Sequence, residues 1–228
     1  MCCSLNQKIS DFKKKFDGIA NESLKFCCAA RAREFQASAA DTLDALKEEA
    51  TGLKTESISA DDEDSANTML GFEMAIDAIR NELQMWISLK DDDPDSAWGH
   101  LVDAQMATFD TMGAHPLFSY FDRYSRRLGI LEKMLFPPQT FVSPGSTAKS
   151  LQCSICGKES GECDHLPGKA YMGKFCNSIV RGLEFKELSI VADPGSKHHR
   201  VTAYSIGGQM RNVMTWRTEE ETPPTSSA

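Results

Sequence analysis

The chain has 228 residues, of which 41% are hydrophobic and 25% are charged, a composition typical of globular proteins. No apolar run approaches the roughly 18–20 residues that a membrane span requires, so we expect no membrane contact. The N-terminal stretch MCCSLNQKISDFKKKF has no apolar segment of the kind that a secretory signal contains. A cytoplasmic protein is therefore expected.

The net charge of −8 is unevenly distributed. Lys149 to Arg217 hold 10 lysines and arginines against 6 acidic residues, whereas Met1 to Ala148 hold 15 against 24. The acidic first two-thirds disfavours a protein that wraps DNA. The basic C-terminal part leaves contact with nucleic acid or an acidic partner open.

Residues 1–138 predict an α-helical domain. Apolar residues recur every three or four positions over 5–53, as in an amphipathic helix that SAAD at 38–41 can divide and Gly52 can end. Three further helices are expected. The first starts at Asp64 or Ser65 and ends near Leu89, and the second follows the turn KDDDPDSAW and ends at Gly113 and Pro116. The third runs roughly from Leu117 to Met134.

The pattern changes after these helices. Residues 139–150, QTFVSPGSTAKS, have the composition of a linker. Within 151–217, the segments FKELSIV, RVTAYSI and MRNVMTW predict a small antiparallel sheet with a hairpin turn at Gly207-Gly208. Residues 218–228 are expected to be a disordered tail. The predicted fold class is α+β, an N-terminal α-helical bundle followed by a small zinc-stabilised module with a short antiparallel sheet.

Five potential metal ligands lie within 24 residues of the C-terminal part: Cys153, Cys156, Cys163, His165 and Cys176. The spacing is C-x2-C-x6-C-x-H, with ten residues between the histidine and the last cysteine. A C-x2-C turn directs both thiolates at one ion, and a glycine such as Gly157 suits that turn. Thiolate and imidazole sets favour Zn²⁺ over magnesium or calcium. The spacing therefore predicts a zinc knuckle.

The sequence leaves the choice of four ligands open. The most compact set is Cys153, Cys156, Cys163 and His165, and Cys176 in place of His165 or Cys163 is the alternative. Four protein ligands leave no open coordination position, which indicates a structural metal rather than a catalytic one. The deaminase signature of H-x-E followed by P-C-x-x-C is absent.

Other candidate residues have simpler interpretations. His198 and His199, near Asp193, are expected in an exposed turn, although they could form an acid–base or metal site. Cys27 is expected in the core, and Cys2-Cys3 lacks the motif of a lipid anchor. The chain also contains no phosphate-binding, dinucleotide-binding, zincin or nucleophile-elbow motif.

The segment CDHLPGKAYMGKFCNSIVRGLEFKELSIVADP, from Cys163 to Pro194, resembles head-assembly proteins of tailed phages. Its KELSIVADP portion resembles the strand evSlV-x-x-P-A of prohead maturation proteases, with Gly195 in place of the alanine. Those proteases have a catalytic histidine and serine upstream on strands, where this chain predicts helices and the cysteine cluster. The resemblance therefore implies a phage or mobile-element origin for the C-terminal module and carries over no catalytic residue.

The first functional hypothesis is a non-enzymatic zinc-binding protein that acts through protein–protein contacts, with another protein or with itself. The second is a protein related to hydrolases or proteases that uses Cys176, His198 or His199. The third is a zinc-knuckle nucleic-acid-binding protein, for which the basic candidates are Lys158, Lys169, Lys174 and Arg181.

Overall fold

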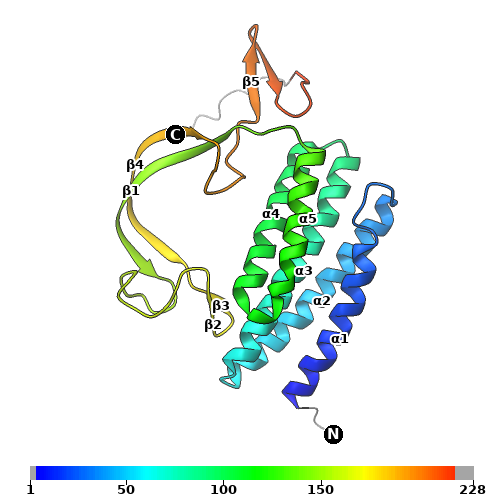
Figure 1. Ribbon diagram of the computed structural model, residues 1–228, viewed down its shortest axis with the longest axis vertical. Coiled ribbons are helices and arrows are strands. Elements are labelled where there is room, and N and C mark those ends of the chain that lie inside the picture. Colours follow the sequence, from blue (N-terminus) through cyan, green and yellow to red (C-terminus); the bar gives the residue numbers. More distant parts are fainter. Residues whose placement is uncertain (1–3, 219–228) are drawn as a thin grey trace, which may run out of the picture.

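The structure, a computed structural model, describes residues 4–218 and has an α+β fold (Figure 1). The helices are α1 (Leu5–Leu24), α2 (Arg33–Ser59), α3 (Glu63–Lys90), α4 (Pro94–Ala114), the 3₁₀ helix η1 (Pro116–Phe121) and α5 (Asp122–Leu135). The strands are β1 (Phe141–Cys153), β2 (Ala170–Tyr171), β3 (Lys174–Phe175), β4 (Ser178–Val191), β5 (Ala203–Ile206) and β6 (Gln209–Asn212). Cys2, Cys3 and all but the first residue of the expected tail at 218–228 lie outside the described residues.

None of the helices in the described part of the chain is both long and apolar enough to cross a membrane.

The first helical stretch divides at residues 25–32, so the expected break at 38–41 is wrong. The apolar spacing continues through Phe26 and Cys27 although both lie in the connecting turn, because the turn itself packs on the bundle. Gln36 holds the turn from inside α2, donating to the carbonyls of Phe26 and Cys28 at 2.9 Å each. The helix α2 then continues past Gly52 to Ser59.

The next helices begin at aspartate caps. Asp62, rather than the expected Asp64 or Ser65, caps α3 by accepting a hydrogen bond from the backbone N–H of Ser65 at 3.0 Å. Asp93 caps α4, and Pro94 occupies the first helical position, where a missing N–H costs nothing. The predicted end of α4 near Gly113 and Pro116 is confirmed.

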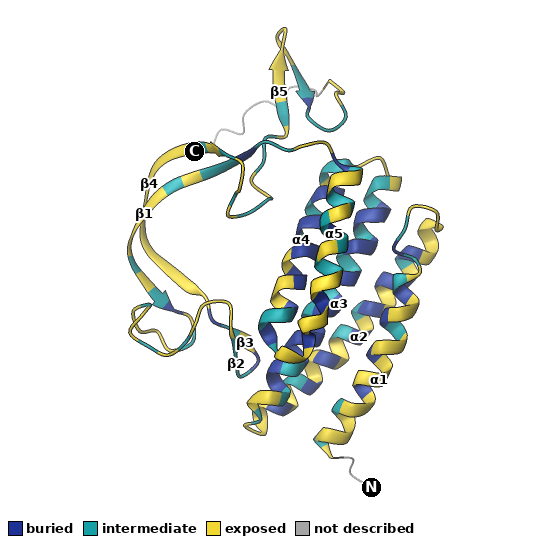
Figure 2. Ribbon diagram, viewed as in Figure 1, coloured by how far each residue is buried: buried dark blue, intermediate teal, exposed yellow. Residues whose placement is uncertain are grey.

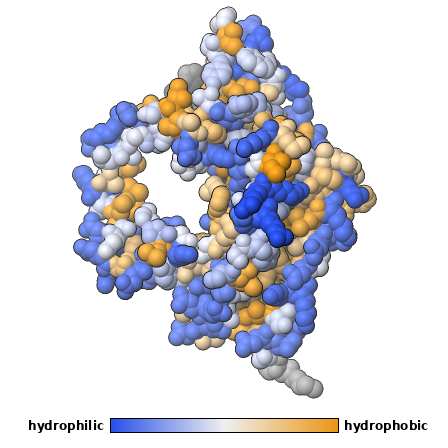
Figure 3. All heavy atoms as spheres, in the orientation of Figure 1, coloured by the Kyte–Doolittle hydropathy of each residue, from blue (hydrophilic) through white to orange (hydrophobic). Residues whose placement is uncertain are grey.

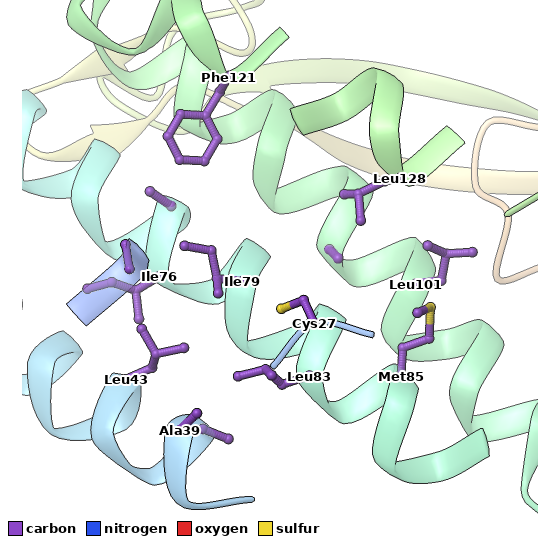
Figure 4. Packing of buried hydrophobic residues seen from close by; sticks show 14 of the residues in the cluster. Cys27, Ala39, Leu43, Ile76, Ile79, Leu83, Met85, Leu101, Phe121 and Leu128 are labelled. Carbon is purple, nitrogen blue, oxygen red and sulfur yellow. The ribbon is translucent and has the colours of Figure 1, made fainter. Parts of the chain in front are cut away.

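The core lies among the helices, with α3 at its centre (Figures 2 and 4). Helix α3 packs against both α2 and α4 and is buried along most of its length. The ring of Phe72 makes edge contacts with those of Phe12, Phe16 and Phe118, with centroids 4.8–5.4 Å apart. Each such buried side chain contributes about 1.5–3 kcal/mol.

One buried carboxylate ties three parts of the bundle together. Glu82 of α3 is fully buried and accepts hydrogen bonds from Tyr124 at 2.6 Å and Arg127 at 2.5 Å, both on α5. Arg127 also donates to the carbonyl of Cys27 at 2.9 Å, which fixes the turn between α1 and α2. Burial and the nearby Glu82 raise the pKa of the Cys27 thiol. The expectation that Cys27 is a core residue is confirmed.

Residues 139–150 do not form the expected linker but lie mostly in β1, which pairs antiparallel with β4. The serine, glycine and proline content of β1 resembles a loop, and the strand forms because β4 offers a partner along its whole length. The predicted single sheet is likewise wrong, since the strands form three separate two-stranded ladders. The hairpin of β5 and β6 turns at Gly207 and Gly208, both with positive φ, as expected.

The ribbon of β1 and β4 contacts the helices at two anchors (Figure 1). At the first anchor, after β4, Arg200 pairs with Asp95 and the carbonyl of Lys197 accepts from the Trp98 indole at 3.0 Å. At the second, Asn67 of α3 accepts from the backbone N–H of Gly173 at 2.8 Å and donates to the carbonyl of Ala170 at 3.3 Å. Between the anchors the ribbon arches away, leaving an opening visible in Figure 3.

Candidate metal centre

The cysteine cluster lies at the end of the ribbon, in the loop from β1 to β4. Cys153 is the last residue of β1 and pairs in register with Ser178, the first residue of β4. The donor atoms of Cys153, Cys156, Cys163 and His165 all lie within 4.8 Å of one another. The structure therefore brings together the most compact set that the spacing predicts.

The first two cysteines occupy a tight turn. The N–H of Gly157 donates to the carbonyl of Cys153 at 2.9 Å, and the N–H of Cys153 donates to the carbonyl of Lys158 at 2.8 Å. Gly157 has a φ of 75°, a conformation that glycine adopts without strain. The turn is the reason that Cys153 and Cys156 present their thiols to the same point.

His165 presents an unpaired nitrogen to this site. Within the described residues its Nδ1 is buried and has no hydrogen-bond partner. The ring packs edge-on against Tyr171, with centroids 4.7 Å apart, and the Tyr171 hydroxyl accepts from the N–H of Leu166 at 2.8 Å. A buried polar atom without a partner costs about 1–3 kcal/mol, and a metal ion would supply the missing partner. These residues therefore suit a metal.

Cys176, the fifth predicted ligand, also lies at the cluster. Its Sγ is 3.7 Å from that of Cys153, and its side chain is buried. Two thiolates bound to one tetrahedral zinc with Zn–S bonds of about 2.3 Å lie roughly 3.8 Å apart. The distance thus suits joint coordination by Cys153 and Cys176, although Cys176 is not among the four donors that all lie within 4.8 Å of one another.

Electrostatics at the site favour a thiolate at Cys153. The backbone N–H groups of Cys156 and Ile155 and the Cys176 thiol hydrogen-bond to its sulfur and lower the pKa of Cys153 to about 6. Burial and the neighbouring Cys153 sulfur instead raise the pKa of Cys176. A divalent cation would stabilise further thiolates, because metal binding and thiol deprotonation are linked.

A pocket beside the cluster is lined by the ligand candidates Cys156, Cys163 and His165 and by the carboxylates Glu162 and Asp164. Glu159, Glu162 and Asp164 are exposed on the loop. None of these carboxylates belongs to the group of mutually close donors. Four protein donors without a positioned carboxylate are typical of a structural zinc site.

The two histidines of the DPGSKHHR turn lie elsewhere. His198 is exposed, and its Nε2 lies 3.0 Å from Oδ1 of Asp103 on α4. The carbonyl of His199 accepts from the N–H of Val142 at 2.9 Å. The 14 residues of β4 separate this turn from Cys176, on the order of 45 Å along the strand. The structure therefore does not bring Cys176 and His198 together as a nucleophile and base.

Sequence reasoning missed two residues that position the loop carrying the cysteine cluster. Asn67 anchors the β2–β3 hairpin, and Tyr171 packs on His165. Asn67 gives no local signal because its partners lie more than 100 residues away in the chain. Tyr171 lies only six positions after His165, and an aromatic residue so close to a ligand was the available signal.

No protein-family model matches the chain, and no curated protein or solved structure shows significant similarity to it.

Proposed function

We propose that the chain is a non-enzymatic, zinc-binding interaction protein. Cys153, Cys156, Cys163 and His165 hold one Zn²⁺, which closes the loop between β1 and β4. The observation that supports this most strongly is the convergence of these four donors within 4.8 Å, with an unpaired Nδ1 among them. The metal would be structural.

The loop that carries the ligands has no apolar core of its own. From Ser154 to Phe175, Gly173 alone is buried. A segment with so little burial cannot offset the entropy of ordering its backbone, about 1–2 kcal/mol per residue. A bound zinc ion supplies folding free energy in small modules of this kind.

The ordered loop fixes one end of the ribbon against α3, and the ribbon is the proposed contact surface. An isolated two-stranded ribbon is marginally stable in water, and this one is supported at its two ends. The resemblance of residues 163–194 to phage head-assembly proteins extends the proposal to partners in an assembly of that kind.

The alternative functions have less support. A hydrolase mechanism would need Cys176 beside a base, whereas His198 contacts Asp103 on α4 and is separated from Cys176 by the whole of β4. A nucleic-acid surface would need grouped basic residues, whereas three carboxylates lie between Lys158 and Lys169 on the loop.

The test is the zinc content of protein purified without added metal, measured by elemental mass spectrometry. We expect about one zinc per chain, lost in Cys156→Ser and kept in Cys28→Ser, a matched control outside the cluster. A metal-free wild-type protein with freely titratable cluster thiols would contradict the proposal.

A second pair of variants identifies the fourth ligand. His165→Ala should weaken zinc binding at least about 100-fold, whereas Cys176→Ser should keep one zinc per chain. The opposite result would assign the fourth position to Cys176.

A further inference from the structure

The pairing of β1 with β4 contains one irregularity with a large effect on the ribbon. Ser146 pairs with Phe185, but the next residue of β1 toward its start, Gly145, pairs with Glu187. Lys186 is therefore an extra residue, a β-bulge in β4. Because side chains alternate between faces, one extra residue exchanges the faces for the rest of the strand.

The bulge places five apolar residues of β4 on one face, while Val180 and Val191 lie on the other. Directly paired residues share a face, and the even-numbered residues from Val142 to Gln152 pair with Ile179, Arg181, Leu183, Phe185, Leu188 and Ile190. Without the bulge, Leu188 and Ile190 would point opposite to Leu183 and Phe185. We call this set of twelve residues the outer face.

The outer face is apolar and exposed. Leu183, Phe185, Leu188 and Ile190 are 65%, 62%, 63% and 77% exposed, respectively. Figure 2 shows β4 as almost continuously exposed. Scattered apolar residues are normal on surfaces, but a contiguous row is typical of an interaction site.

This face points away from the body of the chain at both ends of the ribbon. Phe141 and Cys153, the ends of β1, belong to the opposite face. Phe141 is buried in the core against Trp98, and Cys153 is buried in the cysteine cluster. The outer face is therefore directed outward at both ends, where a large partner has access.

We propose that the occupant of the outer face is the outer face of a second copy of this chain. The inference rests on the proposed function, in which the ribbon is a contact surface, and names the partner. Arg181 is the one ionisable residue among the twelve, and its Nε already donates to Gln152 at 3.2 Å. A nearly uncharged face selects neither nucleic acid nor a strongly charged protein, and it is complementary to itself.

The geometry and area suit such a pair. Two sheets pack face to face about 10 Å apart, and a two-fold axis would place the same patch on both sides of the contact. The exposed apolar side chains offer on the order of 600 Å² per copy, so the pair would bury about 1,200 Å², the lower limit for stable interfaces. We therefore expect a reversible dimer with a Kd on the order of 10 µM.

The experiment is sedimentation velocity of the zinc-loaded full chain from about 1 to 200 µM, with two neighbouring variants. Leu188→Lys places a charge on the outer face, and Glu187→Lys, the control, makes a larger charge change on the opposite face. Wild type should dimerise, Leu188→Lys should raise the Kd at least about 100-fold, and Glu187→Lys should change it less than about threefold. Both exchanged side chains are exposed, so neither change should unfold the chain.

A wild-type chain that stays monomeric at the highest concentration would overturn the proposal, as would two variants that weaken the dimer equally. Zinc content measured on the same samples separates this inference from the proposed function. A monomer with one zinc per chain would refute the dimer alone. A metal-free chain that still dimerises through Leu188 would refute the zinc function alone.

Discussion

The helical bundle and the ribbon with its cysteine cluster are stabilised in different ways. In the bundle, α3 is buried on nearly all sides, and its neighbours are oriented by side-chain packing. In the ribbon, the first eleven residues of β4 are all exposed. The conformation of the ribbon depends instead on strand register, two anchors and the cysteine cluster. Burial of apolar side chains alone therefore determines only the helical part of this fold.

The difference can be tested by damaging the bundle core. Leu83 of α3 is fully buried, and Leu83→Ala should lower the free energy of unfolding by about 2–5 kcal/mol. Chemical denaturation followed by circular dichroism measures this loss. At denaturant concentrations where the variant is still folded, its zinc content should equal that of the wild type. A parallel loss of zinc would show that the loop depends on the bundle core.

Substituting alanine for each of two glycines of the bundle should change its stability in opposite directions. A Cβ on Gly71 would clash with the ring of Phe118, which is fully buried, whereas nothing lies within 4 Å of a Cβ on Gly52. We expect Gly71→Ala to lower the free energy of unfolding by about 1–3 kcal/mol, because the Phe118 ring must move. Gly52→Ala should raise the free energy of unfolding by about 0.5–1 kcal/mol, because alanine has the higher helix propensity. Thermal unfolding of the two variants measures both effects, and equal shifts would contradict the packing described for Phe118.

Alkaline pH should destabilise the bundle through Cys27. Its pKa is raised in the folded chain by burial and by Glu82, so above about pH 8.5 the unfolded thiol loses a proton that the folded one keeps. The free energy of unfolding should then fall by about 1.4 kcal/mol per pH unit from this group. Cys27→Ala should remove that part of the slope between pH 9 and about 10. Identical slopes in wild type and variant would exclude Cys27 as the source.

The smallest expected effect concerns His198. Its contact with Asp103 is exposed on both sides, and even exposed ion pairs contribute only about 0–1 kcal/mol. His198→Ala and His199→Ala should leave zinc content, dimerisation and stability nearly unchanged. A large loss of any of these would restore the turn as a candidate site.

Local signals in the sequence predicted the local features of the structure. The apolar period of about 3.6 placed α3 and α4 closely, and the cysteine spacing indicated the four residues whose donor atoms the structure brings together, Cys153, Cys156, Cys163 and His165. These features depend on residues within a few turns of one another. A reader of the sequence needs no knowledge of the rest of the chain to find them.

Long-range pairing accounts for most of the errors. β1 has few strand-forming residues, and only its partner some 40 residues later makes it a strand. The bulge at Lys186 is invisible without the register of that pairing. The turn at residues 25–32 was missed for another reason, since Phe26 and Cys27 keep the helical spacing while packing on other helices.

The most direct test of the account is hydrogen exchange of the full chain with and without a zinc chelator. Removing the metal should strip protection from the amides of β1 and β4 while those of α3 stay protected, because the core of α3 contains no metal ligand. Loss of protection over α3 and the ribbon together, or no change in either, would contradict the proposed division between a bundle held by its core and a ribbon held by a bound metal.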